Sequence, residues 1–273
     1  MEQIRQFKFS IDDNSFIKKM SDPQIDSRNY CYLTNDGKMI SFSSENLHQT
    51  IENIDNDNIK GWYMTINPTD GNGRKKENIV QREYLVVDID PVRASGSNST
   101  KTQMTESYAL ACRVHNFLPS SYMGCSGNGW HLIYKCRLEN TDEDNQLVNE
   151  FYECLDTFFS TPTQQIDRCM ADINRLTKIY GTMSRKAPHT DDCPQRRSFM
   201  FLSVKDIYPH LNGEVQTTMI NSRVLSDLID IMNVQISEMN TTNSNSSNNN
   251  DNNNQRSTSQ EWIVSWCKKH KLE

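Results

Sequence analysis

The chain has little of what marks membrane, secreted or zinc-binding proteins. No run in its 273 residues approaches the roughly 18 apolar residues of a membrane span, and the polar, charged N-terminal residues do not resemble a signal peptide. Its eight cysteines are scattered without a Cys-x-x-Cys pair, so we expect reduced thiols. His189 and Cys193 have the spacing of half a zinc site, but no second half lies nearby, and we expect no zinc. These absences favour a soluble cytoplasmic protein without a membrane partner.

Net positive charge is also lacking, since the formal net charge is −6. This value argues against a protein that coats nucleic acid by bulk electrostatics. It does not exclude a nucleic-acid enzyme, because an acidic metal centre can lie beside a local basic patch. Such a patch is present between residues 175 and 197, and its members are Arg175, Lys178, Arg185, Lys186, Arg196 and Arg197. The alternative interpretation is a solvated loop with scattered charges.

The hydrophobic patterning predicts one mixed α/β domain over residues 1–238. We expect strands at 30–34, 39–42, 62–66, 83–90, 123–126, 131–134, 176–180 and 199–202. The sequence Asn-Asp-Gly at 35–37 predicts a hairpin turn between the first two. Helices are expected at 45–54, 102–118, 142–160 and 224–236. The fold class is therefore α+β.

The C-terminal residues differ in composition. Asn, Ser and Thr dominate residues 239–260, which predicts a disordered linker because little apolar surface is available for burial. Residues 261–273 include Trp262, Ile263 and Trp266 and predict a short helix. A helix this short is marginal alone, so we expect it to dock on another element or to begin a further domain.

The sequence Asp-Ile-Asp at 88–90 closes the predicted strand 83–90. Side chains alternate along a strand, so Asp88 and Asp90 share one face and Leu85, Val87 and Ile89 share the other. Two adjacent carboxylates repel each other, and a divalent cation commonly offsets that repulsion. A solvated acidic strand end is the alternative.

The sequence Ser-Gly-Asn-Gly-Trp-His at 126–131 predicts a tight turn before a histidine. Gly127 and Gly129 allow close backbone approach, which suits phosphate oxygens. Ser126 and His131 could donate hydrogen bonds to the same anion. An ordinary hairpin turn is the alternative, and on this turn alone it is favoured.

A third carboxylate follows the short apolar step at Ile166. Asp167 could complete a metal site with the first two acids, as in two-metal phosphoryl transfer, with Mg²⁺ or Mn²⁺ as the ion. Asp172 is the alternative third ligand, although its position also suits a turn or cap. Arg175, Lys178 and Lys186 offer cations for a triphosphate, or are surface charges.

In this order, the motifs resemble the archaeo-eukaryotic primase superfamily, and within it the primase-polymerases of phages, plasmids and other mobile elements. The resemblance covers about residues 60–205. It rests on the motifs at 62–68, 88–93, 96–100 and 126–131, on Ile166 and Asp167, on 175–182, and on Arg185, Lys186, Thr190, Pro194 and 196–198. Each motif is weakly specific alone, but few other families would present the ordered set.

The resemblance implies a primase-like core with a mixed or antiparallel, RRM-like central sheet flanked by helices. It implies that Asp88, Asp90 and Asp167 are catalytic metal ligands and that His131 holds the phosphates of the incoming nucleotide. Single-stranded DNA template and NTP or dNTP are the implied partners, with a helicase domain or protein as a further one. Ala94 and Ala187 stand where relatives usually carry Pro and Gly, but neither is a proposed ligand.

Two other functions were weighed. A metal-dependent glycosyltransferase would also use paired aspartates, but it does not account for the glycine turn, the later acid or the basic cluster. A catalytically idle replication-initiation module that binds DNA is the non-enzyme alternative, and the retained acids and His131 argue against it. A rolling-circle nickase is disfavoured because the chain has no His-x-His pair.

Overall fold

A computed structural model describes residues 28–42, 47–201 and 219–246 of the chain. Within these ranges, none of the helices has the length and apolar character needed to cross a membrane.

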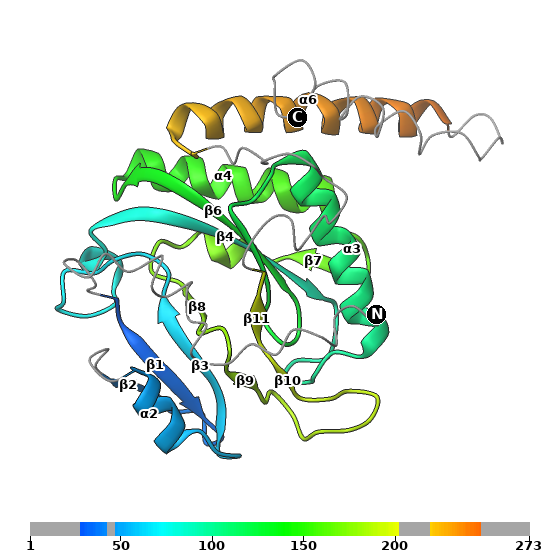
Figure 1. The fold of residues 1–273 in the computed structure, drawn as a ribbon. Coiled ribbons are helices and arrows are strands. Elements are labelled where there is room, and N and C mark those ends of the chain that lie inside the picture. Colours follow the sequence, from blue (N-terminus) through cyan, green and yellow to red (C-terminus); the bar gives the residue numbers. More distant parts are fainter. Residues whose placement is uncertain (1–27, 43–46, 202–218, 247–273) are drawn as a thin grey trace, which may run out of the picture.

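Two antiparallel sheets form the framework (Figure 1). The larger has the strand order β11-β5-β6-β4-β7. Its strands are β4 (Gln81–Pro91), β5 (Tyr122–Cys125), β6 (Trp130–Glu139), β7 (Gln164–Ile166) and β11 (Phe199–Met200). The long strand β4 therefore lies between β6 and β7, with its acidic end beside both.

The smaller sheet has the order β2-β1-β3-β8 and lies beside the larger one (Figure 1). Its strands are β1 (Tyr30–Thr34), β2 (Met39–Phe42), β3 (Ile59–Thr65) and β8 (Leu176–Lys178). The short helix α2 (Leu47–Ile54) joins β2 to β3. The strands β9 (Met183–Ser184) and β10 (Arg196–Arg197) form a two-stranded ladder.

Helices α3 (Lys101–Phe117) and α4 (Asp142–Phe159) cover one face of the larger sheet, and α6 (Ser222–Ser246) packs on the outside of α4 (Figure 1). Thr100 and Thr141 cap α3 and α4 by accepting from the backbone N–H groups of Gln103 and Asp144. The 3₁₀ helices η4 (Lys76–Asn78) and η5 (Arg168–Ala171) precede β4 and β8.

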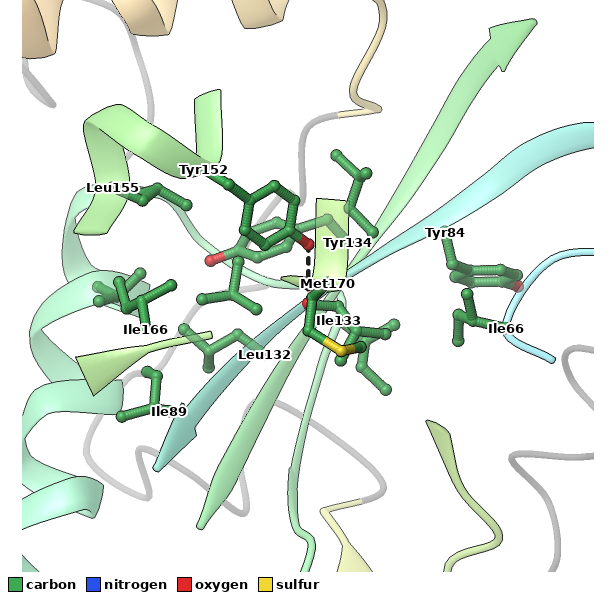
Figure 2. Packing of buried hydrophobic residues seen from close by; sticks show 14 of the residues in the cluster. Ile66, Tyr84, Ile89, Leu132, Ile133, Tyr134, Tyr152, Leu155, Ile166 and Met170 are labelled. Atoms are coloured by element: carbon green, nitrogen blue, oxygen red, sulfur yellow. Dashed lines mark hydrogen bonds between the residues drawn. The ribbon is translucent and has the colours of Figure 1, made fainter. Parts of the chain in front are cut away.

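Cross-strand pairing identifies which face of the large sheet meets the helices. Trp130 pairs with Ile89, and its indole N–H donates to the carbonyl of Met104 on α3 at 3.1 Å. Ile89 and its same-face neighbours Val87 and Leu85 therefore lie toward α3, and all three are buried. Figure 2 shows Tyr152 of α4 above the same strands, with its hydroxyl donating to the carbonyl of Val86 at 2.7 Å. The opposite face carries Asp88 and Asp90 and is free of these helices.

The mixed α/β class and the predicted strands and helices are confirmed, with both sheets in the antiparallel form. The hairpin over residues 30–42 pairs as expected. Several elements differ in length: β3 begins earlier, at Ile59, and β8 ends earlier, at Lys178. β6 continues to Glu139, and α6 continues to Ser246, into the first residues of the expected linker. The rest of that linker and the expected helix over 261–273 lie outside the described residues.

Candidate functional site

Two acids and a histidine lie on one face of the large sheet, and a third acid follows the adjacent strand β7. Asp88 on β4 pairs with His131 on β6. On its other side, the backbone N–H of Asp167 donates to the carbonyl of Asp88 at 2.9 Å, directly after the pair formed by Ile89 and Ile166. Directly opposed residues of antiparallel strands share a face, so Asp88 has His131 on one side and Asp167 on the other. Asp90 shares the face by the period-two alternation along β4.

His131 is held between two side chains. Its Nε2 lies 3.4 Å from Oδ1 of Asp88, and its Nδ1 lies 2.6 Å from the hydroxyl of Tyr180. The residue is buried, with 4% of its surface exposed. Tyr180 thus fixes the ring orientation, and sequence reasoning missed this role. Tyr180 lies in the motif at 175–182, but nothing in the sequence marks its hydroxyl as the partner of His131.

The two acids of β4 have different electrostatic surroundings. Burial alone would raise the pKa of Asp88, but the charges of His131, Lys186 and Arg93 hold that pKa below its usual value. Burial and the charge of Asp88 raise the pKa of Asp90. The adjacent cations of Lys186 and Arg93 only partly offset this effect. The pair therefore shares a site where a second negative charge is unfavourable.

Asp90 has two cationic contacts. Its Oδ2 lies 3.3 Å from Nη2 of Arg93 and 3.8 Å from Nζ of Lys186. Its other oxygen faces Gly129, where an added Cβ would lie 2.1 Å from Oδ1 of Asp90 and 2.5 Å from the carbonyl of Ile89. Gly129 is therefore required because any side chain would displace the carboxylate.

The glycine turn is internally bonded. The backbone N–H groups of Asn128 and Gly129 donate to the hydroxyl of Ser126. The backbone N–H of Ser126 donates to the carbonyl of Gly129, and the backbone N–H of Gly127 donates to the Cys125 sulfur. Gly127 has φ +99, and a Cβ there would lie 2.6 Å from Cβ of Ser184. The Ser126 hydroxyl, expected to donate to phosphate, thus donates within the turn, to the carbonyl of Gly129. The turn leads into β6, which carries His131, and it leaves room for Asp90.

The acid pair fits a hard divalent cation. Oδ1 of Asp88 is buried and, within the described part of the chain, accepts no hydrogen bond of ordinary geometry, although Nε2 of His131 lies 3.4 Å away. A buried carboxylate oxygen of this kind needs a donor or a cation. The side chain of Asp167 accepts from the backbone N–H of Cys169 at 2.9 Å. Across residues 28–42, 47–201 and 219–246, no three His, Cys, Asp or Glu side chains are grouped to hold a metal ion, so Asp167 would have to turn toward the pair to become a third ligand.

Asp172 and Arg175 lie in a separate group. Asp172 forms ion pairs with Lys76 at 3.2 Å and with Arg175 at 3.3 Å. The Nε of Arg175 also donates to the carbonyl of Cys169 at 2.6 Å. These contacts account for both charges without the acid pair. Between the two candidates for third ligand, Asp167 is the one whose backbone joins Asp88.

Lys178 lies on β8 of the small sheet beside Tyr63, its cross-strand partner. Its Nζ lies 4.8 Å from the centre of the Tyr63 ring and has no hydrogen-bond acceptor among the described residues. Burial, followed by the charges of Lys186 and Arg185, lowers the pKa of Lys178 to about 7, against the opposing charge of Asp55. A buried amine of this kind is only partly charged near neutral pH.

The predicted basic patch divides into separate tasks. Arg185 forms an ion pair with Asp55 at 2.7 Å. Arg196 donates to the carbonyl of Ser99 at 2.7 Å, and Arg197 donates to that of Gly181. Lys186 is the member that reaches the acid pair. Sequence reasoning also left Arg93 without a role, although its place three residues after Asp90 lets it contact that carboxylate.

Neither a protein-family model nor a curated protein sequence matches this chain.

Proposed function

We infer that the protein is a template-directed nucleotidyl transferase, a DNA primase or polymerase of the archaeo-eukaryotic type. The observation that carries this inference is the arrangement around β4: Asp88 lies between His131 and Asp167, and Asp90 lies beside Lys186. Acids that can hold a cation stand next to donors that can hold phosphate. Phosphoryl transfer depends on this combination, because its catalysis consists mostly of positioning and charge stabilisation.

Asp88 and Asp90 would hold a Mg²⁺ or Mn²⁺ ion, with Asp167 as the further ligand. When bound, such ions neutralise charge on the phosphates and lower the pKa of an attacking hydroxyl. Asp167 can serve after its carboxylate leaves the backbone N–H of Cys169. Asp172 does not support the role equally well, because Lys76 and Arg175 already pair with it.

His131 and Lys186 would bind the triphosphate. A lysine ammonium carries three donors, and a ring N–H of histidine adds a directed one. Tyr180 sets the His131 ring, while Arg93 stays on Asp90 when Lys186 turns to phosphate. The incoming nucleotide would thus replace Asp90 as the anion beside Lys186. Single-stranded DNA would supply the template, and a helicase domain or protein is a compatible partner.

Primer extension tests the proposal. Wild-type protein is incubated with a single-stranded template, labelled NTPs or dNTPs and Mg²⁺ or Mn²⁺, with and without a primer. We expect incorporation by wild type and none by Asp88→Asn, which keeps the side-chain shape but removes the charge. Asp144→Asn is the matched control, since Asp144 lies on α4 away from the acid pair. Absence of template-dependent incorporation by wild type under all these conditions would contradict the proposal.

A further inference from the structure

Two buried asparagines connect the loop after β4 to the segment that carries Lys186. Asn98 belongs to the loop between β4 and α3, and Asn128 belongs to the glycine turn. Their exposed fractions are 2% and 1%. Buried amides need their hydrogen bonds satisfied, so the partners of these two side chains fix what they connect.

Asn98 holds the chain directly after Lys186. Its Nδ2 donates to the carbonyl of Ala187 at 3.0 Å, and its Oδ1 accepts from the backbone N–H of Ala187 at 3.3 Å. The same Nδ2 lies 3.2 Å from the carbonyls of Pro188 and Cys193. One side chain therefore closes the loop that follows Lys186 onto the loop that follows Asp90.

Asn128 holds the chain just before Lys186. Its Nδ2 donates to the hydroxyl of Ser184 at 3.1 Å, and its Oδ1 accepts from the backbone N–H of Ser99 at 2.8 Å. The hydroxyl of Ser99 donates back to the carbonyl of Asn128 at 2.6 Å. The amides therefore hold Ala187, the next residue after Lys186, and Ser184, two residues before it.

The backbone ladder around Lys186 is too short to fix this position. β9 and β10 are two residues long each, and Ser184 is the last residue of β9. Between this ladder and Lys186, the backbone N–H of Arg185 donates to the carbonyl of Lys60 at 2.8 Å, and its guanidinium pairs with Asp55. The two amides add a restraint on the other residues around Lys186, Ser184 and Ala187, and both belong to segments adjacent to the acid pair.

We propose that Asn98 and Asn128 are positioning residues that hold Lys186 beside Asp90, and so set where a phosphate can bind. The part about phosphate rests on the proposed nucleotidyl transfer. The part about Lys186 does not, since it concerns the 3.8 Å approach of its Nζ to Asp90 in the protein alone. Neither asparagine touches substrate in this account.

The first experiment measures Lys186 directly by acylation with an N-hydroxysuccinimide ester and mass spectrometry. In Asn98→Ala we expect Lys186 to react about fivefold faster, the factor that corresponds to loss of roughly 1 kcal/mol of hydrogen bonding. Exposed Lys135 is the reference, and buried Lys178 reports global opening. An unchanged Lys186 rate relative to Lys135 would overturn the proposal. If Lys178 also becomes reactive, the Asn98→Ala protein has opened globally. Asn98→Ser, which keeps one hydroxyl donor, is then measured instead, and the ratio of the Lys186 rate to the Lys135 rate again decides.

The second experiment is a double-mutant cycle with dATP and Mg²⁺. Asn98→Ala and Lys186→Ala should each weaken dATP binding, by about fivefold or more, and the double variant should bind no more weakly than Lys186→Ala. If the loss of dATP affinity in the double variant equals the product of the two single losses, Asn98 does not act through Lys186. Asn140→Ala is the control, because Asn140 also donates to two backbone carbonyls, those of Lys76 and Ile79, away from the acids. If wild type binds no dATP, the proposed function fails while the acylation result still decides the positioning role.

Discussion

The carboxylate of Asp90 occupies the space that a side chain at Gly129 would need. The distance of 2.1 Å from Oδ1 to a Cβ built at Gly129 leaves no room for even a methyl group. Gly129 and Asp90 are therefore in direct steric contact, and a change at either residue affects the position of the other.

Gly129→Ala should destabilise the fold by about 1–3 kcal/mol, the usual cost of forcing an extra carbon into a packed site. It should also abolish nucleotide incorporation, because the carboxylate must move. Urea denaturation and primer extension measure the two effects. Adding Asp90→Ala should relieve part of the destabilisation, since only the contact with the Ile89 carbonyl at 2.5 Å remains. Equal destabilisation in both backgrounds would show that Asp90 is not what excludes the side chain.

His131 and Tyr180 should act as a unit. If His131 binds the triphosphate, His131→Ala weakens dNTP binding by about 1–3 kcal/mol, the range for hydrogen bonds to charged groups. Tyr180→Phe removes the hydroxyl that lies 2.6 Å from Nδ1, so a smaller loss of about 1 kcal/mol is expected. Titration calorimetry measures both. The double variant should match His131→Ala, and affinity for single-stranded DNA should hardly change; equal losses for DNA and nucleotide would point to a role in shaping the sheet.

The two candidates for third metal ligand can be separated. Asp167→Asn should abolish incorporation yet leave stability almost unchanged, because an Asn oxygen still accepts from the backbone N–H of Cys169. Asp172→Asn weakens exposed ion pairs with Lys76 and Arg175, which costs less than about 1 kcal/mol, and incorporation should continue. Primer extension and thermal melts of both variants provide the comparison. The opposite ranking of activities would transfer the role to Asp172.

Lys178 should make stability depend on pH. Its pKa is about 7 in the folded protein and near its ordinary value when unfolded, so above pH 7 the unfolded chain binds more protons. Stability then rises with pH by up to ~1.4 kcal/mol per unit, and the destabilising effect is complete below pH 7. Lys178→Met should therefore stabilise most at pH 6 and progressively less at pH 7, 8 and 9.

Urea denaturation of wild type and Lys178→Met at these pH values gives the difference, which cancels other titrating groups. Lys135→Met is the matched control and should show no such trend. Lys135 belongs to β6 and lies exposed over the ring of Tyr122 on β5. A constant difference between wild type and Lys178→Met across the series would contradict a buried, partly neutral amine.

The sequence allowed good prediction of what depends on local pattern. Period-two alternation located β4 and the shared face of Asp88 and Asp90, and the Asn-Asp-Gly turn located the first hairpin. The strand order did not follow from local pattern, because it depends on pairings between distant residues such as Ile89 and Ile166. The C-terminal limit of α6 was misplaced since its last turns are rich in Asn, Ser and Thr, which are weak helix formers.

The glycine turn shows why site chemistry is harder to predict. Glycine signals a need for space or an unusual φ, but the sequence does not say which neighbour needs the space. For Gly129 the neighbour is Asp90, and for Gly127 it is Ser184. Charge has the same ambiguity, because Arg185 and Lys186 are adjacent in sequence while the first pairs with Asp55 and the second with Asp90.

The position of β4 inside the larger sheet has a consequence for how the site opens. Asp88 lies on a strand with a paired neighbour on each side, so that strand can open only when the sheet itself comes apart. Lys186 follows a two-residue strand and is held by the backbone bond from Arg185 to Lys60 and by side-chain amides, so its segment can open at lower free energy. The strand of Asp88 thus opens only when the whole domain unfolds, whereas the segment of Lys186 can open locally. Any adjustment to a ligand should therefore fall on the segment of Lys186, and hydrogen exchange should show protection gained there on nucleotide binding.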